Sequence, residues 1–524
     1  MFVEKETQVN KSRPIAHAPA GSFVGSREKL ASVWRGIRYA KPPTGELRWR
    51  DPVAASPADG MVDALVYGPA APQLANPAVP LGEDTRVDED CLFLNVWAPS
   101  GHQAAGHQAE ALPVMVWIHG GAYTFGSAAQ PMYHGAKFVS TGEVIVVTLN
   151  YRLGGLGFLD LSGVNSAEFD GNLALKDVLL ALRWVRHNIA AFGGDPDRVT
   201  VFGESAGGGL VTALLATPSA EGLFHRAIAQ SSPASSMYGA ERATQVAKRF
   251  LAAVGVPDGD AERLRALASE EVVQAAMSVY AQVPQEAPGT LAFAPVIDGT
   301  LLPEAPVKVL SEGRGLKVPL IIGTNRDEAS LFKFMKSPLI PITDDRIMQM
   351  FGDMSAEAPE IEMPPIEQVR AAYEGVRHRA LGLGVARDIG FRMPTLWVAE
   401  GHSRVAPVWL YRFDYSTPFL RLLGLGATHA TELPYLWGNL DGGPKDPTFK
   451  LGGRRVAQSI SPRMRARWVA FAKGEAPNAP DAPAWAAYEL TSRSTLVIDA
   501  VDRCEPDLDG ALREGWGDTV LSFS

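Results

Sequence analysis

The sequence predicts an α/β protein in which helices flank a central, twisted and mostly parallel sheet. Two nearly continuous apolar runs, residues 112–119 and 144–150, have the composition of strands that are buried on both faces. Residues 172–192 carry apolar side chains at helical spacing and end at a Gly-Gly-Asp-Pro turn. Further strands are predicted at residues 199–202 and 227–230. This alternation of strands and helices is typical of a doubly wound parallel sheet.

The remaining elements follow this alternation along the chain. Residues 240–280 have a helical pattern, and residues 316–323 and 408–413 have the composition of strands. Residues 330–400 are rich in Met, Phe and Pro, and we expect them to form a helical insertion that caps the site. We expect the whole chain, residues 1–524, to form a single domain.

Six apolar side chains of this insertion have two possible roles. They could form the apolar wall of a substrate pocket, or they could be ordinary helix core. These side chains are Phe332, Phe334, Met335, Met348, Met350 and Phe351.

The most informative motif links a predicted strand to a predicted helix. The strand at residues 199–202 is followed by Gly203-Glu204-Ser205-Ala206-Gly207, and a helical run covers residues 210–216. This is the G-x-S-x-G pattern of a tight strand-to-helix turn, in which glycines flank an exposed serine hydroxyl. We therefore expect Ser205 to be a nucleophile at the end of a sheet strand.

A serine hydroxyl needs a neighbouring base, and a carboxylate must in turn orient that base. Asp327 and Glu328 follow the strand that is predicted to end at Gly323. A carboxylate on a loop at the carboxyl end of a strand is well placed to orient a base. The spacing leaves both residues open as the acid.

Three histidines lie downstream of this acid. His378 lies between two arginines and His402 follows Glu400 and Gly401, so we expect both on the surface. His429 follows a Gly-rich turn downstream of a strand, which makes it the best candidate for the base.

Backbone donors for an oxyanion are predicted upstream of the nucleophile. His119 ends a predicted buried strand and precedes Gly120 and Gly121, where the backbone can approach a ligand closely. A Gly-Gly pair can also be a plain turn, but a nucleophile turn downstream favours an oxyanion hole. We expect the N–H groups of Gly120, Gly121 and Ala206 to form it.

Stretches through nearly the whole chain resemble the type-B carboxylesterases, which include cholinesterases and bacterial para-nitrobenzyl esterases. The resemblance implies the α/β-hydrolase fold with Ser205 as nucleophile and His429 as base. It also favours Glu328 over Asp327 as the acid. The matching stretches are residues 89–96, 119–122, 150–154, 171–172, Asp177, 192–196, 202–208, 230–231, 323–328 and 429–438.

The resemblance also implies roles for neighbouring residues and for the protein as a whole. Glu204 and Ser231 would lie beside the catalytic residues, and Glu432 would be a buried structural carboxylate. The expected reaction is hydrolysis of small-molecule carboxylic esters with apolar groups through an acyl-enzyme. The same residues could serve carbamates or amides, and some relatives are non-catalytic binding domains. Here the intact Ser205, Glu328 and His429 favour an enzyme.

The Gly-Gly-Ala sequence at residues 120–122 carries a further implication of the resemblance. It matches the loop variant that accepts esters of bulky tertiary alcohols.

Composition and charge limit which partners and which cellular compartment we expect for this protein. The net charge of −9 argues against a nucleic-acid partner, and no apolar run approaches the roughly 18 residues that span a bilayer. The charged N-terminus does not resemble a signal peptide. The chain has two cysteines, Cys91 and Cys504. Secreted members of the family pair the counterpart of Cys91 with an upstream cysteine that is missing here, so we expect Cys91 to be free and the protein to be cytoplasmic.

Other chemistries have weaker support in the sequence. The S-x-x-K spacing of Ser26 and Lys29 lies in a polar turn, and His429 with Glu432 is too little for a zinc site. His102 and His107 lie in an Ala/Gln/His-rich loop that we expect to be solvated. We therefore expect no metal and no cofactor, and a monomer or a weak homo-oligomer.

Overall fold

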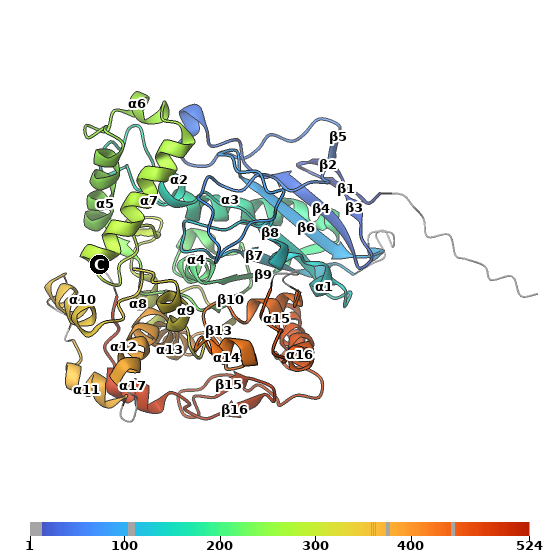
Figure 1. Ribbon diagram of the computed structural model, residues 1–524. Helices are drawn as coiled ribbons and strands as arrows, with labels where there is room; N and C mark the ends of the chain where they lie inside the picture. The colour runs from blue at the N-terminus through green and yellow to red at the C-terminus, as the bar shows by residue number, and fades with distance from the viewer. Residues whose placement is uncertain are drawn as a thin grey trace, which may run out of the picture.

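The computed structural model describes residues 13–522 apart from 103–109, 358, 360, 362, 374–377 and 442–445. Within these residues, the main sheet has 11 strands in the order β16-β15-β14-β13-β10-β9-β7-β8-β6-β4-β3. The run from β15 to β8 is parallel, whereas the pairings at both edges are antiparallel. The predicted mostly parallel sheet is therefore confirmed (Figure 1).

The strands and helices have the following bounds. The parallel strands are β7 (Leu112–Ile118), β8 (Ile145–Leu149), β9 (Gly194–Glu204), β10 (Arg226–Gln230), β13 (Leu320–Asn325), β14 (Val408–Phe413) and β15 (Thr495–Ile498). The antiparallel strands at the edges are β3 (Ser26–Arg27), β4 (Ala31–Arg38), β6 (Phe93–Pro99) and β16 (Arg503–Glu505). Smaller elements are β1 (Ile15–Ala18), β2 (Gly21–Val24), β5 (Met61–Asp63), β11 (Tyr238–Gly239), β12 (Val296–Ile297), α1 (Ala136–Val139), α2 (Gly154–Gly157), α8 (Pro306–Ser311), α14 (Pro418–Leu422), α15 (Leu433–Trp437) and α17 (Gly510–Trp516).

Helices cover both faces of the sheet because successive strand side chains point to opposite faces. Val199 and Val201 of β9 belong to the core that includes the apolar faces of α3 (Leu173–Asn188) and α4 (Ala206–Leu215). Phe202 belongs to the opposite core beneath α16 (Arg454–Lys473), where its ring lies 4.8 Å from that of Trp117. The continuous apolar strands of the sequence are thus explained by two buried faces.

Two predictions from the sequence are wrong in detail. The strand predicted at residues 316–323 begins only at Leu320, because Pro319 has no N–H to donate to the sheet. His402 was expected on the surface but is fully buried at the end of α13 (Met393–His402). Its Nε2 lies 2.8 Å from the Val318 carbonyl oxygen, because α13 packs against the segment that leads into β13.

Two groups of helices lie together on one side of the molecule (Figure 1). The first is the predicted helical region, with α5 (Ala240–Ala253), α6 (Ala261–Arg265) and α7 (Ser269–Glu286). The second has α9 (Ala329–Phe334), α10 (Asp344–Glu357), α11 (Ile366–Ala371), α12 (His378–Arg387), a π-helical turn (Asp388–Arg392) and α13. An ion pair between Arg242 and Glu357 joins the two groups. No helix in the described parts of the chain is long and apolar enough to cross a membrane.

Candidate active site

Ser205 lies on a strained turn between β9 and α4. Its backbone has φ 58° and ψ −124°, a conformation that non-glycine residues rarely adopt. The flanking residues must be glycines, because a Cβ on Gly207 would lie 2.0 Å from the Ile118 carbonyl oxygen and one on Gly203 would lie 2.6 Å from Gly207. The Ser205 N–H donates to the Gln230 carbonyl oxygen at 2.9 Å, which ties the turn to the neighbouring strand β10.

The structure brings Ser205, His429 and Glu328 together from three separate segments. Ser205 Oγ lies 2.8 Å from His429 Nε2, and His429 Nδ1 lies 2.6 Å from Glu328 Oε2. Glu328 is fully buried, and its other oxygen, Oε1, accepts hydrogen bonds from Ser231 Oγ at 2.6 Å and from the Asn325 N–H at 2.7 Å. These contacts hold the carboxylate in one orientation toward the imidazole.

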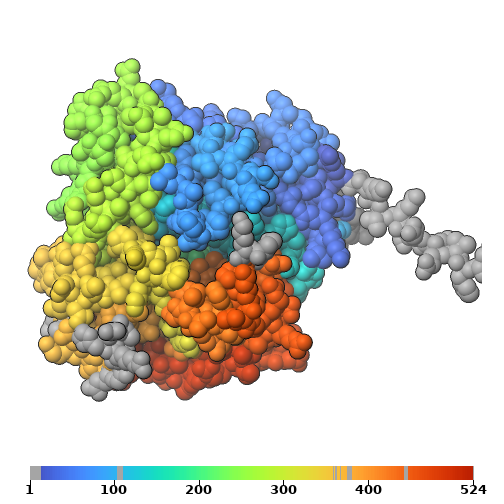
Figure 2. All heavy atoms as spheres, viewed as in Figure 1, coloured from blue at the N-terminus to red at the C-terminus, as the bar shows by residue number. Residues whose placement is uncertain are grey.

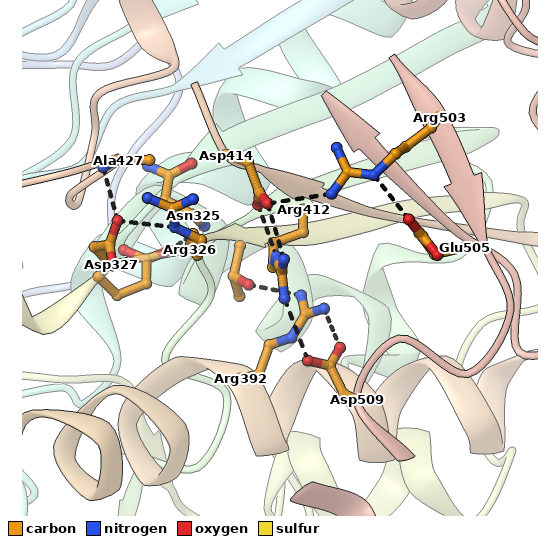
Figure 3. Close-up of polar contacts among 12 residues, drawn as sticks. Asn325, Arg326, Asp327, Arg392, Arg412, Asp414, Ala427, Arg503, Glu505 and Asp509 are labelled. Atoms are coloured by element: carbon orange, nitrogen blue, oxygen red, sulfur yellow. Dashed lines mark hydrogen bonds and ion pairs between the residues drawn. The ribbon is translucent and has the colours of Figure 1, made fainter. Parts of the chain in front are cut away.

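Asp327, the alternative acid, contacts the loop before His429 and has no contact with the imidazole. Its Oδ2 accepts from the Ala427 N–H at 3.0 Å, and its own N–H donates to the Ala427 carbonyl oxygen at 2.9 Å (Figure 3). A hydrogen bond from Asn325 Nδ2 to the Thr428 carbonyl oxygen at 2.8 Å joins the same two loops. Asp327 thus helps to hold the histidine loop against the loop that carries Glu328.

Two further carboxylates, Glu204 and Glu432, are buried close to His429. Glu204 Oε1 lies 3.3 Å from His429 Nε2. Glu432 accepts hydrogen bonds from Gln230 Nε2 at 3.0 Å and from Asn325 Nδ2 at 2.6 Å. Both side chains are almost completely inaccessible to solvent. The site therefore holds three buried carboxylates around a single imidazole.

This concentration of negative charge governs the titration of the site. Burial lowers the pKa of His429, but the carboxylates of Glu204 and Glu328 outweigh this effect and raise the pKa to about 9. Burial, together with Glu432 and Glu328, raises the pKa of Glu204 to about 8, against the lowering effect of His429. Glu204 and His429 thus compete for protons and titrate as a coupled pair.

The loop that contains Gly120 and Gly121 lies directly against the serine turn. A Cβ on Gly120 would lie 2.6 Å from the Glu204 carbonyl oxygen, and Gly121 has φ +120°. His119 is buried, and burial lowers its pKa to about 4, so the ring is neutral at pH 7. Its Nδ1 donates to the Gly120 carbonyl oxygen at 2.9 Å, and its ring stacks on Tyr151. The neutral imidazole therefore orients the first peptide group of this loop.

Two cavities meet at Ser205. The larger has a volume of about 530 Å³ and is lined by Glu204, His429 and residues from four stretches of chain, 76–83, 120–133, 331–339 and 430–441, together with Tyr280. In Figure 2, blue, green, yellow and orange segments meet near the centre of one face, in agreement with this mixture of stretches. The smaller cavity, of about 60 Å³, has mainly apolar walls, including Pro233, Leu291, Ile389 and Phe391.

The six apolar side chains of the insertion divide between the two possible roles. Phe332 and Met335 line the large cavity, and Phe332 also lines the small one. Met350 and Phe351 are core residues, whereas Phe334 and Met348 are exposed. The pattern did not distinguish these roles, because only the packing of α9 and α10 decides which side chains reach the cavity.

Several other predicted residues lie away from this site. Cys91 is buried and Cys504 is partly buried, and both are free thiols. His102 Nε2 lies 3.2 Å from the Gly193 carbonyl oxygen. His107 lies outside the described residues, and so does the side chain of His378.

Two sets of contacts at the site were not predicted from the sequence. His119 was noted only as the residue before the glycines, and its role depends on a ring that folds back on the next peptide. The Phe391 ring lies 4.9 Å from the His429 ring, and the Phe332 ring lies 5.2 Å from it. Phe332 was expected as a pocket wall or as helix core, and Phe391 was not singled out. No local pattern predicts that either ring lies against His429, because they meet it only in the folded chain.

Comparisons with known proteins agree with this architecture. A model of the carboxylesterase family matches residues 12–508. The para-nitrobenzyl esterase of Bacillus subtilis is 38% identical over 94% of this chain and 96% of its own length. The phenmedipham hydrolase of Pseudarthrobacter oxydans is 34% identical over 93% of this chain and 95% of its own length.

Solved structures give the same result. A PNB esterase structure matches with a TM-score of 0.82 and 37% identity, covering 97% of this chain and 100% of that one. The chain thus has the α/β-hydrolase fold with helices on both faces of its sheet. It belongs to the carboxylesterase family and is a carboxylic-ester hydrolase.

Proposed function

We propose that the enzyme cleaves esters through an acyl-enzyme on Ser205, with His429 as general base and Glu328 as the orienting acid. The observation that carries this proposal is the continuous hydrogen-bonded series from Ser205 Oγ to His429 Nε2 at 2.8 Å and from His429 Nδ1 to Glu328 Oε2 at 2.6 Å. As Ser205 Oγ attacks the ester carbonyl carbon, His429 takes its proton and then passes it to the leaving alkoxide. Water then hydrolyses the acyl-enzyme by the same route.

The negative charge on the carbonyl oxygen would be stabilised by backbone N–H groups. Gly120, Gly121 and Ala206 are our candidates, because the glycine loop packs on the serine turn and Ala206 is the first residue of α4. The N-terminus of a helix adds a favourable dipole for an anion. His119 supports this loop through its hydrogen bond to the Gly120 carbonyl oxygen.

The two cavities suggest how an ester is oriented. The general acid must reach the leaving oxygen, and among the described residues His429 lines the large cavity and not the small one. We therefore assign the alcohol part of the ester to the large cavity and the acyl part to the small apolar one. Within the single domain that we propose, the insertion at residues 330–400 would then act as the cap, since Leu339 and Ile389 line the acyl cavity.

The same chemistry could act on carbamates or amides, because amides give the same acyl-enzymes as esters and carbamates give the corresponding carbamoyl-enzymes. A set of p-nitrophenyl esters, p-nitrophenyl carbamates and p-nitroanilides of matched chain length would rank these three classes of substrate. We expect the esters to have the highest kcat/KM. A higher value for a carbamate would instead place the enzyme among carbamate hydrolases.

Substitution and labelling of the serine test the assignment of the nucleophile. Ser205→Ala should lower kcat by several orders of magnitude while the thermal unfolding midpoint stays nearly unchanged. An organophosphate should label Ser205 in the wild-type enzyme, as located by peptide mass spectrometry. Labelling of another serine, or full activity of the variant, would contradict the proposal.

A further inference from the structure

The wall of the small cavity includes an unusual backbone segment. Residues Asp388–Arg392 form a π-helical turn between α12 and α13. Ile389, Gly390 and Phe391, in the middle of this turn, all line the cavity beside Ser205. π-Helical turns are rare and frequently occur at functional sites.

Both ends of this turn are charged and buried. Asp388 is fully buried and Arg392 is 2% exposed. Asp388 accepts hydrogen bonds from Tyr373 Oη at 2.5 Å and from Arg387, and Trp516 Nε1 donates to Tyr373 Oη at 3.1 Å. Trp516 is the last residue of α17, so the C-terminal helix supports the first end of the turn.

The second end is held by the residue that precedes α17. Arg392 Nη2 forms an ion pair with Asp509 (Figure 3). Arg392 Nη1 donates to Thr324 Oγ1 at 2.8 Å. Thr324 belongs to β13, four residues before Glu328. Arg392 therefore connects the cavity wall both to the C-terminal segment and to the strand that leads to the orienting acid.

Further ion pairs extend outward from Asp509. Arg412 Nη1 lies 3.7 Å from Asp509, and Arg412 also forms two hydrogen bonds with Asp414 (Figure 3). Removing Asp509 would leave the Arg392 guanidinium buried without its carboxylate. A buried charge that loses its partner is strongly unfavourable, so the turn would have to move.

We propose that Asp509 is a positioning residue that sets acyl selectivity by holding Arg392 and hence the cavity wall at Ile389, Gly390 and Phe391. Among the described residues, Asp509 lines neither of the two cavities that meet at Ser205. Its link to the cavity wall is the ion pair with Arg392, whereas its other partner, Arg412, belongs to β14. This inference rests on the proposed assignment of the small cavity to the acyl group. Asp509 would thus determine acyl selectivity although it lies more than 100 residues in sequence from the cavity wall.

The test compares p-nitrophenyl acetate with p-nitrophenyl hexanoate. In Asp509→Asn we expect KM for the hexanoate to rise at least fivefold, because the wall that binds the chain is no longer held. The kcat for the acetate should stay within twofold of wild type, since a two-carbon acyl group needs little of that wall. Asp509→Glu, which keeps the carboxylate, should restore part of the selectivity.

The matched control is Asp507→Asn, in the same segment. Asp507 pairs with Arg513 at 2.9 Å and has no contact with Arg392 among the described interactions, so its loss should leave the acetate-to-hexanoate ratio unchanged. If Asp509→Asn does not fold, Arg392→Met combined with Asp509→Leu removes both charges and still breaks the connection. An unchanged ratio, or an equal loss on both esters, in a folded variant would overturn the proposal.

Titration with an organophosphate separates this inference from the proposed function. If Ser205 is labelled in the wild-type enzyme and Gly390→Val, which narrows the small cavity, changes the acetate-to-hexanoate ratio while Asp509→Asn does not, the positioning role is wrong. If neither variant changes the ratio, the assignment of the small cavity to the acyl group is wrong. If Ser205 is not labelled, the assignment of the nucleophile itself is wrong.

Discussion

Glu204 Oε1 lies 3.3 Å from His429 Nε2, the same nitrogen that lies 2.8 Å from Ser205 Oγ. The imidazole is therefore flanked by carboxylates on both ring nitrogens, because Nδ1 contacts Glu328. In the mechanism that we propose, this arrangement would stabilise the imidazolium that forms during proton transfer, but it also favours protonated His429 in the resting enzyme. His429 is therefore protonated more easily than an isolated histidine.

The pH dependence of kcat/KM should reflect this arrangement. In the mechanism that we propose, protonated His429 cannot accept the proton of Ser205, so activity should be lost as pH falls through the pKa of His429. Because the nearby carboxylates raise this pKa to about 9, we expect the midpoint above that of an unperturbed histidine, which is about 6.5. In Glu204→Gln one carboxylate is neutralised, so the midpoint should move to lower pH by about one unit.

The measurement is a pH–rate profile with one p-nitrophenyl ester for the wild type and the variant. Glu221→Gln, at an exposed position, is the control and should keep the wild-type midpoint. An unchanged or higher midpoint in Glu204→Gln would show that Glu204 does not control the titration of the base.

Filling the small cavity should shorten the acyl groups that the enzyme accepts. Gly390 lines this cavity, and a Cβ added there would meet no atom within 4 Å, so Gly390→Val places its methyl groups in open space. We expect kcat/KM for p-nitrophenyl hexanoate to fall at least tenfold while that for the acetate changes little. Gly352→Val, at an exposed helix position with equally open space, should change neither value. Equal effects on both esters would contradict the acyl assignment.

The loop at Gly121 should determine both the rate and the range of alcohols. Gly121 has φ +120°, and a Cβ there would lie 2.1 Å from the Phe125 carbonyl oxygen. Gly121→Val must therefore displace the loop. Since we propose Gly121 as an oxyanion donor, we expect a loss of roughly 3 kcal/mol, or about 100-fold in kcat. We also expect the wild type to hydrolyse a tertiary acetate slowly, well below the rate for the matching primary ester.

Gly142→Val is the control for backbone strain alone. Gly142 also has positive φ, but a Cβ there would meet nothing within 4 Å, and it is exposed. It should lower stability without lowering kcat. If the wild type leaves tertiary acetates untouched while it cleaves primary acetates quickly, the inference of an open loop is wrong.

Loss of a buried ion pair near the strand ends should lower the free energy of unfolding far more than loss of an exposed ion pair. Asp177 is fully buried and accepts hydrogen bonds from the N–H, Nε and Nη2 of Arg152, at 3.0, 2.9 and 2.8 Å. Asp177→Ala leaves this guanidinium unpaired and should lower the free energy of unfolding by about 3–5 kcal/mol, measured by urea denaturation. Asp197→Ala removes an exposed pair with Arg186 and should cost less than about 1 kcal/mol. Similar losses in both variants would contradict this distinction.

Local patterns in the sequence determined the parallel sheet, the helices on its faces and the turn that carries Ser205. These features depend on near neighbours: apolar periodicity selects strands and helices, and the turn at Ser205 accepts only glycines at Gly203 and Gly207. Chain order and the family resemblance pointed to Glu328 and His429, and the structure places His429 against Ser205 and Glu328 against His429. Spacing alone left Asp327 open, because two adjacent carboxylates differ only in the direction in which they point.

Only the tertiary structure decided the contacts that tune this site. Glu204 was placed near the base by resemblance, but its contact with His429 Nε2 depends on how β9 meets the histidine loop. The Phe391 ring lies beside the His429 ring, and Asp509 pairs with Arg392, although the two residues of each pair are far apart in the sequence. No local sequence pattern predicts such contacts. Apolar periodicity predicts that one face of a helix or strand is buried, but it does not show which element packs against that face. Charges and rings that meet across the fold are set by packing geometry, which exists only when the whole chain is folded.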